Sequence, residues 1–313
     1  MNEAQDLKTP RPQDLSGVLV VDKTEGPTSH DVVTFARRAL GVSRIGHTGT
    51  LDPMATGVLP LVIGRATRLA QFLTASDKTY EATLAFGRMT DTYDTSGKVT
   101  GTSERRPVRE ELESALISFR GTFEQTPPAY SAKNIDGERS YELARQAKTA
   151  IAQRPKAVPV TVKRLEIVTF DGDTARLEMQ VAAGFYVRAL SHDLGEALGC
   201  GAVLTALRRT RSGEFSIGPA VPLADVLQAG REALSARLIP MAALLTDLPS
   251  VTLVGQANLD RLKNGVEMAP SDLISPLAAI PPMVRLLGPD GDLVGLAKPG
   301  KTPGCLHGSI VLV

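Results

Sequence analysis

Residues 46–59 read GHTGTLDPMATGVL, and no other segment of the sequence is as informative. Its three glycines allow the backbone to approach other groups closely. Pro53 biases Asp52 toward an extended conformation, which would hold the carboxylate in one orientation. The segment is therefore typical of a ligand-facing loop that presents one carboxylate. The Asp-Pro pair alone, however, favours an ordinary turn in which the aspartate side chain is hydrogen-bonded to its own local backbone.

Six further segments surround this loop and strengthen the first interpretation. They are DKTEGPTS (22–29), KTYEA (78–82), TDTYDTSG (90–97), PPAYSA (127–132), GFYVR (184–188) and LRR (207–209). In sequence and in order, these segments and the loop resemble the signature segments of the bacterial TruB family, over about residues 15–215. Thr24 and Asn134 depart from the family pattern, in which proline is usual at the first position and lysine is frequent at the second. The resemblance implies a tRNA pseudouridine synthase that acts at position 55 of the T-loop.

The residues in and around these segments predict strands and helices in mixed order. Strands are expected at 17–23, 58–63, 79–86, 158–170 and 175–181. Helices are expected from 28 or 29 to 40 and at 67–73, 107–119, 140–153 and 185–198, with a loop over 43–57. Since the regular alternation of a doubly wound sheet is missing, we expect an α+β fold with a largely antiparallel or mixed central sheet flanked by helices. The resemblance implies the pseudouridine-synthase fold.

The chain of 313 residues is long enough for about two domains. Residues 1–14 are polar and contain proline, so we expect a flexible tail. Residues 15–247 would form the catalytic domain, and the segment DLPS at 247–250 marks a boundary. Residues 250–313 indicate a small β-rich module, with a helix at 253–264 and short strands at 284–287, 293–297 and 310–313. By resemblance it is a PUA-like RNA-binding module.

Composition excludes several classes of protein. Apolar residues make up 42% of the chain and charged residues 22%, and no run approaches the roughly 18 apolar residues of a membrane span. The first fifteen residues contain no apolar segment of the kind that directs export. Only Cys200 and Cys305 are present, far apart, which excludes a disulfide framework and a thiolate zinc site. We expect a cytoplasmic protein without a membrane partner.

Cofactor and metal motifs are absent from the sequence. It contains neither a GxGxxG nor a GxxxxGK[ST] phosphate loop, and the metal motifs HExxH and HxE…PCxxC are missing. Ordinary side chains must therefore carry any chemistry. The implied reaction agrees, because moving uracil from its N1 to its C5 attachment involves no redox change and no net hydrolysis. We expect no cofactor and no metal.

The resemblance assigns the catalysis to Asp52, Arg188 and Tyr80. Asp52 would either attack C1′ of the ribose or remove a ribose proton, and the sequence leaves both routes open. An ionised carboxylate in a site closed to water requires a cation, and by resemblance this is Arg188, whose planar guanidinium can bind a carboxylate bidentately. A structural ion pair elsewhere is the alternative for Arg188. Tyr80 would stack on the target base, although its place in an alternating strand also suits core packing.

Three more residues match family positions that contact the substrate, namely His47, Tyr186 and Leu207. Tyr186 and Leu207 would line the uracil pocket, and either could instead serve core packing. His47 would enter the T-loop and occupy the space that the flipped nucleotide leaves, with general-base catalysis as the alternative. Asp91 and Asp94 are interpreted as loop-capping groups rather than metal ligands.

The net charge is only +1, from 35 basic and 34 acidic residues, so RNA binding must come from local clusters. Basic residues without any acid occur from 145 to 164, and a second cluster lies around Arg208 and Arg209. Charge alone favours a solvated face. The resemblance places the first cluster beside an RNA-contacting insertion, so phosphate contacts are assigned to Lys148, Arg154, Lys156, Arg208 and Arg209. The partner would be the T-arm stem-loop of tRNA, bound by a monomer.

The function expected from these residues is isomerisation of uridine 55 in tRNA. The glycosidic bond would be cleaved, the extruded base would rotate, and C5 would be joined to the sugar. The main alternative is a tRNA-folding factor, an RNA chaperone that uses this scaffold with little or no catalysis. An N-glycosidase would need a second carboxylic acid and an admitted water, for which the sequence offers no good candidate.

Overall fold

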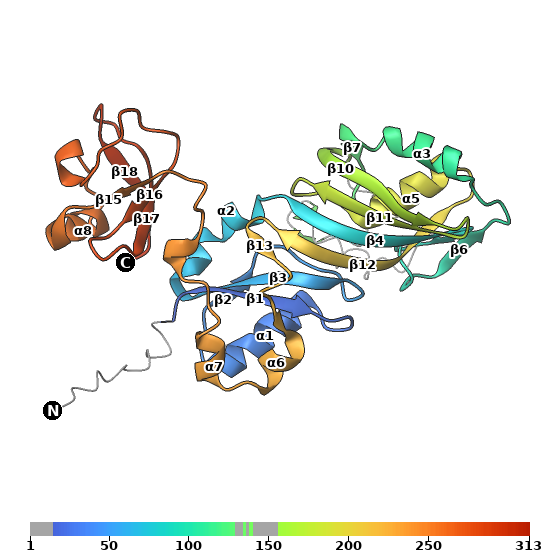
Figure 1. Cartoon of the computed structure of the whole chain (residues 1–313), viewed down its shortest axis with the longest axis horizontal. Coiled ribbons are helices and arrows are strands. Elements are labelled where there is room, and N and C mark those ends of the chain that lie inside the picture. Colours follow the sequence, from blue (N-terminus) through green and yellow to red (C-terminus); the bar gives the residue numbers. More distant parts are fainter. Residues whose placement is uncertain (1–14, 129–133, 136–137, 140–155) are drawn as a thin grey trace.

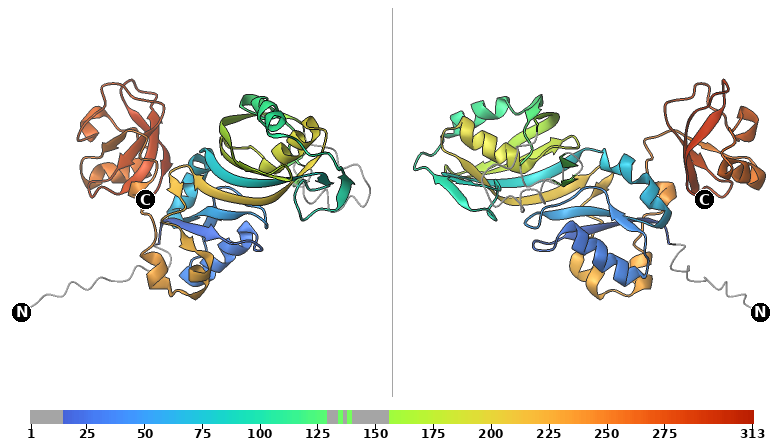
Figure 2. Two further views of the ribbon diagram at one scale, coloured as in Figure 1. Left: turned by 45° about the vertical axis from the view of Figure 1, so that its right-hand side comes forward. Right: turned by 180° about the vertical axis from the view of Figure 1, so that it is seen from behind.

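The computed structural model describes residues 15–128, 134–135, 138–139 and 156–313, and one large mixed sheet forms its centre (Figure 1). A second, four-stranded sheet forms the C-terminal part of the chain. Figure 2 shows both parts from two further directions. The tail expected at 1–14 and the helix expected at 140–153 lie outside the described residues.

The large sheet has ten strands, eight of which follow one another in the order β14-β1-β3-β12-β4-β11-β10-β7. Neighbouring strands in this order pair antiparallel, except that β1 is parallel to β14 and β3 is parallel to β12. The expected mixed sheet is therefore confirmed. Two short strands lie beside this path, β2 (Ile45–His47) on β3 and β13 (Phe215–Ser216) on β12. The main strands are β1 (Gly17–Lys23), β3 (Thr56–Ile63), β4 (Lys78–Phe86), β7 (Gly121–Gln125), β10 (Val158–Phe170), β11 (Thr174–Val181), β12 (Ala202–Ser212) and β14 (Val221–Pro222).

Two groups of helices pack on this sheet. In Figure 1, α1, α6 and α7 lie together near β1, and α3 and α5 lie at the other end of the sheet. Helix α1 begins and ends where the sequence predicts, because Thr28 and Asp31 form a capping box and Gly41 ends the helix with φ +65°. The helices are α1 (Ser29–Leu40), η2 (Gly64–Leu69), α2 (Ala70–Thr74), α3 (Arg109–Ile117), α5 (Val187–Ala197), α6 (Leu223–Gln228), α7 (Arg231–Ser235) and η3 (Met241–Ala243).

Alternation along the strands separates two cores. Leu19 and Val21 of β1 belong to a cluster that includes residues of α1, α3 and α5, whereas Val18 and Val20 belong to a second cluster. Farther along the sheet, every second residue of β4 is buried. Tyr80 of β4 faces the first core, which is the face that carries the site described below.

A hairpin of β5 (Arg88–Thr90) and β6 (Val99–Thr102) leaves the large sheet, and its loop returns to it. Leu204 of β12 donates its N–H to the carbonyl of Tyr93 at 3.0 Å and accepts the N–H of Thr95 at 3.2 Å. The loop thereby forms an isolated parallel bridge with β12, in which Asp94 pairs with Leu204. A second short pair, β8 (Asn134–Ile135) with β9 (Glu138–Arg139), follows later in the chain.

The C-terminal sheet docks on the second core. Leu296 and Leu312 pack in one cluster with Val18 and Leu69, and Arg65 donates to the carbonyl of Leu312 at 3.0 Å. No helix in the described ranges is long and apolar enough to cross a membrane. This part contains β15 (Ser250–Thr252), α8 (Gly255–Lys263), η4 (Pro270–Asp272), β16 (Val284–Leu287), β17 (Leu293–Pro299) and β18 (Leu306–Val311).

Three sequence expectations are corrected. The segment 43–57, expected as a loop, contains β2 and the first residues of β3. The helix expected at 67–73 is a 3₁₀ turn, η2, followed by the short helix α2. Strand β12 is not among the strands that the sequence predicts. Its polar residues do not indicate a buried strand, and it is buried because β3 and β4 lie on either side of it.

Candidate active site

A pocket of about 430 Å³ opens between the β2–β3 loop, β4, β12 and the segment that leads from β11 into α5. All six residues that the sequence analysis assigned to catalysis or base binding line it. Its volume is within the range of small-molecule sites. The lining consists of His47, Gly49, Thr50, Leu51, Asp52, Thr74, Lys78, Tyr80, Leu207, Arg209 and residues 181–188.

Asp52 and Arg188 form a bidentate ion pair in the wall of this pocket. Nε of Arg188 donates to Oδ2 of Asp52 at 2.8 Å, and Nη2 donates to Oδ1 at 3.2 Å. The Arg188 side chain is 7% exposed and that of Asp52 is 34% exposed. The carboxylate is therefore open to the pocket, while the cation that orients it is buried.

The loop between β5 and β6 supports the buried guanidinium. Arg188 donates through Nη1 to the carbonyl of Thr92 at 3.1 Å, and its Nε lies 3.7 Å from Oδ2 of Asp94. Asp94 also accepts the N–H of Ser96 at 2.9 Å, and Asp91 accepts a backbone N–H across the loop at 2.8 Å. The loop-capping interpretation of both aspartates is confirmed. The contact of Asp94 with Arg188 was not anticipated, because the two residues are far apart in the sequence.

Lys23, at the end of β1, holds the C-terminal side of the Asp52 loop. Its side chain is fully buried, and its ammonium donates to the carbonyls of Pro53 at 3.2 Å and Ala55 at 2.7 Å. Burial lowers the pKa of Lys23 to about 8, and the nearby carboxylate of Asp52 opposes this shift. The sequence analysis did not single out Lys23, since lysine is rarely buried.

Arg209 of β12 holds the other side of the same loop. It is 1% exposed, and it donates through Nε to the carbonyl of Val58 at 2.7 Å and through Nη2 to that of Gly49 at 3.0 Å. Gly57 approaches the strand so closely that a Cβ there would lie 2.2 Å from the carbonyl oxygen of Arg209. The phosphate contact expected for Arg209 is therefore corrected, because its guanidinium is buried against backbone carbonyls.

A second buried ammonium, that of Lys78, lines the pocket itself. It donates to the carbonyls of Thr74 at 2.5 Å and Ser76 at 2.6 Å. Burial, with a smaller contribution from the positive charge of Arg209, lowers the pKa of Lys78 to about 8. Below that pH Lys78 adds a positive charge to the lining of the pocket.

Tyr80 of β4 and Leu207 of β12 reach the pocket from the sheet. They are 9% and 8% exposed and belong to the first core while also lining the pocket. Core packing and contact with a base are thus compatible at both positions. Tyr186, which directly precedes α5, is fixed by the buried side chain of Gln125, which accepts its N–H at 2.9 Å and donates to its carbonyl at 3.0 Å. Gln125 is a further residue that sequence reasoning missed.

His47, the last residue of β2, lines the pocket at the start of the loop. Its Nδ1 accepts the N–H of Gly49 at 3.3 Å. Burial lowers the pKa of His47, and the positive charge of Arg209 lowers it further. The lowered pKa favours the neutral ring, and the hydrogen bond that Nδ1 accepts leaves the proton of that form to Nε2. A neutral, flat ring suits insertion among stacked bases.

The structure describes two of the four other residues that were assigned to phosphate contacts. Arg208 forms a bidentate pair with Asp22 at 2.8 and 3.2 Å, and its side chain is 40% exposed. Lys156 is exposed. Lys148 and Arg154 lie outside the described residues.

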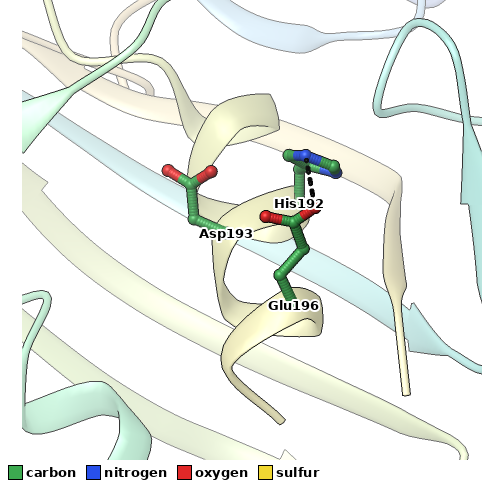
Figure 3. A group of neighbouring side chains, drawn as sticks. All are labelled: His192, Asp193 and Glu196. Atoms are coloured by element: carbon green, nitrogen blue, oxygen red, sulfur yellow. Dashed lines mark ion pairs between the residues drawn. The ribbon is translucent and has the colours of Figure 1, made fainter. Parts of the chain in front are cut away.

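One group of side chains in the described ranges could offer ligand atoms to a metal ion. His192, Asp193 and Glu196 of α5 place one ligand atom each within 4.8 Å of one another. Nε2 of His192 lies 3.4 Å from Oε1 of Glu196. Figure 3 shows these two side chains facing each other from successive helical turns, whereas Asp193 projects from another side of the helix. The absence of a metal from the reaction stays a prediction from the sequence.

A family model for the N-terminal domain of TruB family pseudouridylate synthases matches residues 37–187, and one for the tRNA pseudouridylate synthase B C-terminal domain matches residues 188–246. The chain is 44% identical over 302 residues to tRNA pseudouridine synthase B of Solibacter usitatus (strain Ellin6076), covering 95% of this chain and all of that protein. The chain belongs to the TruB family of pseudouridine synthases.

Other TruB relatives and solved structures agree. The chain is 45% identical over 260 residues to tRNA pseudouridine synthase B of Symbiobacterium thermophilum, covering 82% of this chain and 84% of that protein. It matches a chain of the archaeal box H/ACA sRNP Nop10-Cbf5 complex, with a TM-score of 0.69, 24% identity and coverage of 98% and 89%. A Cbf5-Nop10-Gar1 complex gives a TM-score of 0.71, 24% identity and coverage of 96% and 88%. The expected fold class and enzyme class are thus confirmed.

Proposed function

We propose that this TruB family member converts uridine 55 in the T-loop of tRNA to pseudouridine, with Asp52 as the catalytic residue. The observation that carries the proposal is the bidentate Asp52–Arg188 pair in the wall of a pocket that Tyr80 also lines. The names of the TruB relatives described above support tRNA as the substrate.

In the proposed reaction, the uridine leaves its helical stack and enters the pocket. The face of Tyr80 restores part of the lost stacking, on the order of 1–3 kcal/mol. The bond between C1′ and N1 then breaks with its electron pair on N1, the base rotates, and C5 forms the new bond to C1′. C5 loses a proton and N1 gains one, so the composition of the nucleotide does not change.

Asp52 initiates this sequence by one of two routes. It either forms a bond to C1′ that breaks again when C5 attaches, or removes a ribose proton that is returned once C5 has attached. Both routes require an ionised, oriented carboxylate in a site from which the bound RNA excludes water. The buried guanidinium of Arg188 offsets the cost of that charge and fixes both carboxylate oxygens.

We further propose how the RNA is held. Residues 15–247 act as the catalytic domain, and residues 250–313 act as a PUA-like RNA-binding module. The T-arm stem-loop contacts one monomer through His47 in the loop and through phosphate contacts to Lys148, Arg154, Lys156 and Arg208. The cysteines Cys200 and Cys305 are free thiols, which agrees with the cytoplasm as the compartment.

The test uses unmodified tRNA transcripts, in which pseudouridine is mapped by a chemistry specific for it. The wild-type protein should modify position 55, and a transcript with cytidine at that position should stay unmodified in the T-loop. The variant Asp52→Asn should bind the T-arm with unchanged affinity and form no product, because an amide can neither attack nor accept a proton. Product formation by Asp52→Asn, or modification at another position alone, would overturn the proposal.

A further inference from the structure

Outside the pocket, the rings of Tyr93 and His192 stack on each other. Their centroids are 3.9 Å apart and their planes differ by 8°. Tyr93 lies in the loop between β5 and β6, and His192 lies on α5. We propose that this stack is a positioning device that fixes Arg188, and through it the Asp52 carboxylate, in the geometry needed for turnover. The inference rests on the proposed function.

The stack belongs to a two-point contact between the loop and α5. Arg188 and His192 are four residues apart on α5, so their side chains lie one turn apart on the same face of the helix. Arg188 contacts the residues on both sides of Tyr93, through the carbonyl of Thr92 at 3.1 Å and the carboxylate of Asp94 at 3.7 Å. Residues 92–94 of the loop therefore contact two side chains that lie one turn apart on the same face of α5.

The backbone of Tyr93 indicates why such a contact is needed. Its φ is +66°, a left-handed conformation that is unfavourable for a bulky side chain and persists only where the surroundings hold it. The hydrogen bonds to Leu204 hold the loop against β12, and the stack on His192 holds it against α5. If the stack is lost, the loop can relax, and the carbonyl and carboxylate that support Arg188 move with it.

The imidazole of His192 is also oriented from its edge. Its Nε2 lies 3.4 Å from Oε1 of Glu196, which comes from the next helical turn (Figure 3). The His192 side chain is only 14% exposed, whereas that of Glu196 is 65% exposed. The ring is thus held between a tyrosine face and an exposed carboxylate. The proposed positioning role depends on the stack with Tyr93. The contact with Glu196 can be tested separately, by a substitution that leaves the stack in place.

The stack should affect turnover without affecting RNA binding. Neither Tyr93 nor His192 is among the described residues that line the pocket. A shift of Arg188 by a fraction of an ångström would misalign the Asp52 carboxylate with C1′, and rates depend steeply on such alignment. Loss of an aromatic pair of this kind should slow product formation by about three- to tenfold.

The test compares variants that remove the stack with variants that keep it. His192→Leu and Tyr93→Asn each remove one ring, and asparagine tolerates the left-handed backbone, so Tyr93→Asn separates the loss of the ring from backbone strain. His192→Phe and Tyr93→Phe keep two flat rings. Glu196→Gln leaves the stack intact and weakens only the edge contact. Each variant is assayed for the single-turnover rate at saturating tRNA, for tRNA affinity and for thermal unfolding.

We expect His192→Leu and Tyr93→Asn to lose rate about three- to tenfold with unchanged affinity, while the two phenylalanine variants and Glu196→Gln keep the wild-type rate. Full activity of His192→Leu and Tyr93→Asn would overturn the inference. So would an equal loss in the phenylalanine variants, or a rate loss that is matched by a loss of affinity or by unfolding at the assay temperature. Failure of the proposed function is distinct, because in that case the wild-type protein itself yields no product or Asp52→Asn stays active.

Discussion

The guanidinium of Arg188 meets the carboxylate of Asp52 edge to edge, with Nε and Nη2 each donating to a different oxygen, at 2.8 and 3.2 Å. This geometry requires a planar group with two parallel N–H donors, which arginine has and lysine lacks. The buried cation thus controls both the charge and the direction of the carboxylate.

Arg188→Lys should therefore lower the single-turnover rate by about a hundredfold, while tRNA affinity changes by less than about threefold. The matched control is Arg164→Lys, because Arg164 forms a similar bidentate pair with Glu166 but is not among the described residues that line the pocket. The control should keep rate and affinity within about threefold. Equal losses of rate and affinity in Arg188→Lys would make Arg188 a binding residue.

Gln125→Ala should destabilise the protein. It removes two hydrogen bonds to the backbone of Tyr186 and leaves a backbone N–H and a carbonyl without these partners. We expect the free energy of unfolding to fall by about 2 kcal/mol, measured in urea. Glu124→Ala, an exposed position on the same strand, should change it by less than about 0.5 kcal/mol. Similar values for both variants would contradict this role of Gln125.

The lowered pKa of Lys78 should make the free energy of unfolding depend on pH. Its pKa is about 8 in the folded protein and 10.5 as the ordinary value, so between these pH values the unfolded chain binds more protons than the folded one. The free energy of unfolding should therefore rise with pH across this window. Lys78→Met should remove part of the rise and leave the part due to Lys23, while Lys98→Met, at an exposed position, should leave it unchanged. A rise of wild-type size in Lys78→Met would contradict the assignment.

The salt dependence of tRNA binding tests the proposed phosphate contacts. Replacing Lys148, Arg154 and Lys156 together by alanine should reduce the slope of log affinity against log salt by about 2. The control is Arg164→Ala, because that guanidinium is already paired with Glu166 at 2.6 Å. An unchanged slope in the triple variant would assign these cations to an ordinary solvated surface.

Local signals in the sequence predicted much of the fold. The strand at 17–23 and the helix that Thr28 caps and Gly41 ends were predicted at their observed positions, because strand propensity, capping and the left-handed glycine act over a few residues. The pairing of Asp52 with Arg188 was expected from the resemblance alone, since composition and spacing do not connect two residues so distant in the chain.

The parts that sequence reasoning missed depend on contacts between distant segments. Lys23 looks like a surface lysine until the β2–β3 loop covers it. Strand β12 mixes apolar and basic residues, and its burial follows from its place between β3 and β4. For Arg209, the sequence indicates a charge but not that three backbone carbonyls enclose it, so the residue was assigned to the RNA surface.

The alternation of side chains on β12 determines how well this strand would tolerate an insertion or a deletion. Leu207 and Arg209 point to the pocket and Arg208 points to the opposite face, and irregular pairing with β4 lies on either side of these residues, between 204 and 206 and between 209 and 211. A shift of this stretch by one residue against β4, which a deletion or insertion at its start would cause, would turn all three side chains to the opposite face. Orthologues and engineered versions should therefore accept changes of residue type in β12 far more readily than any gain or loss of a single position.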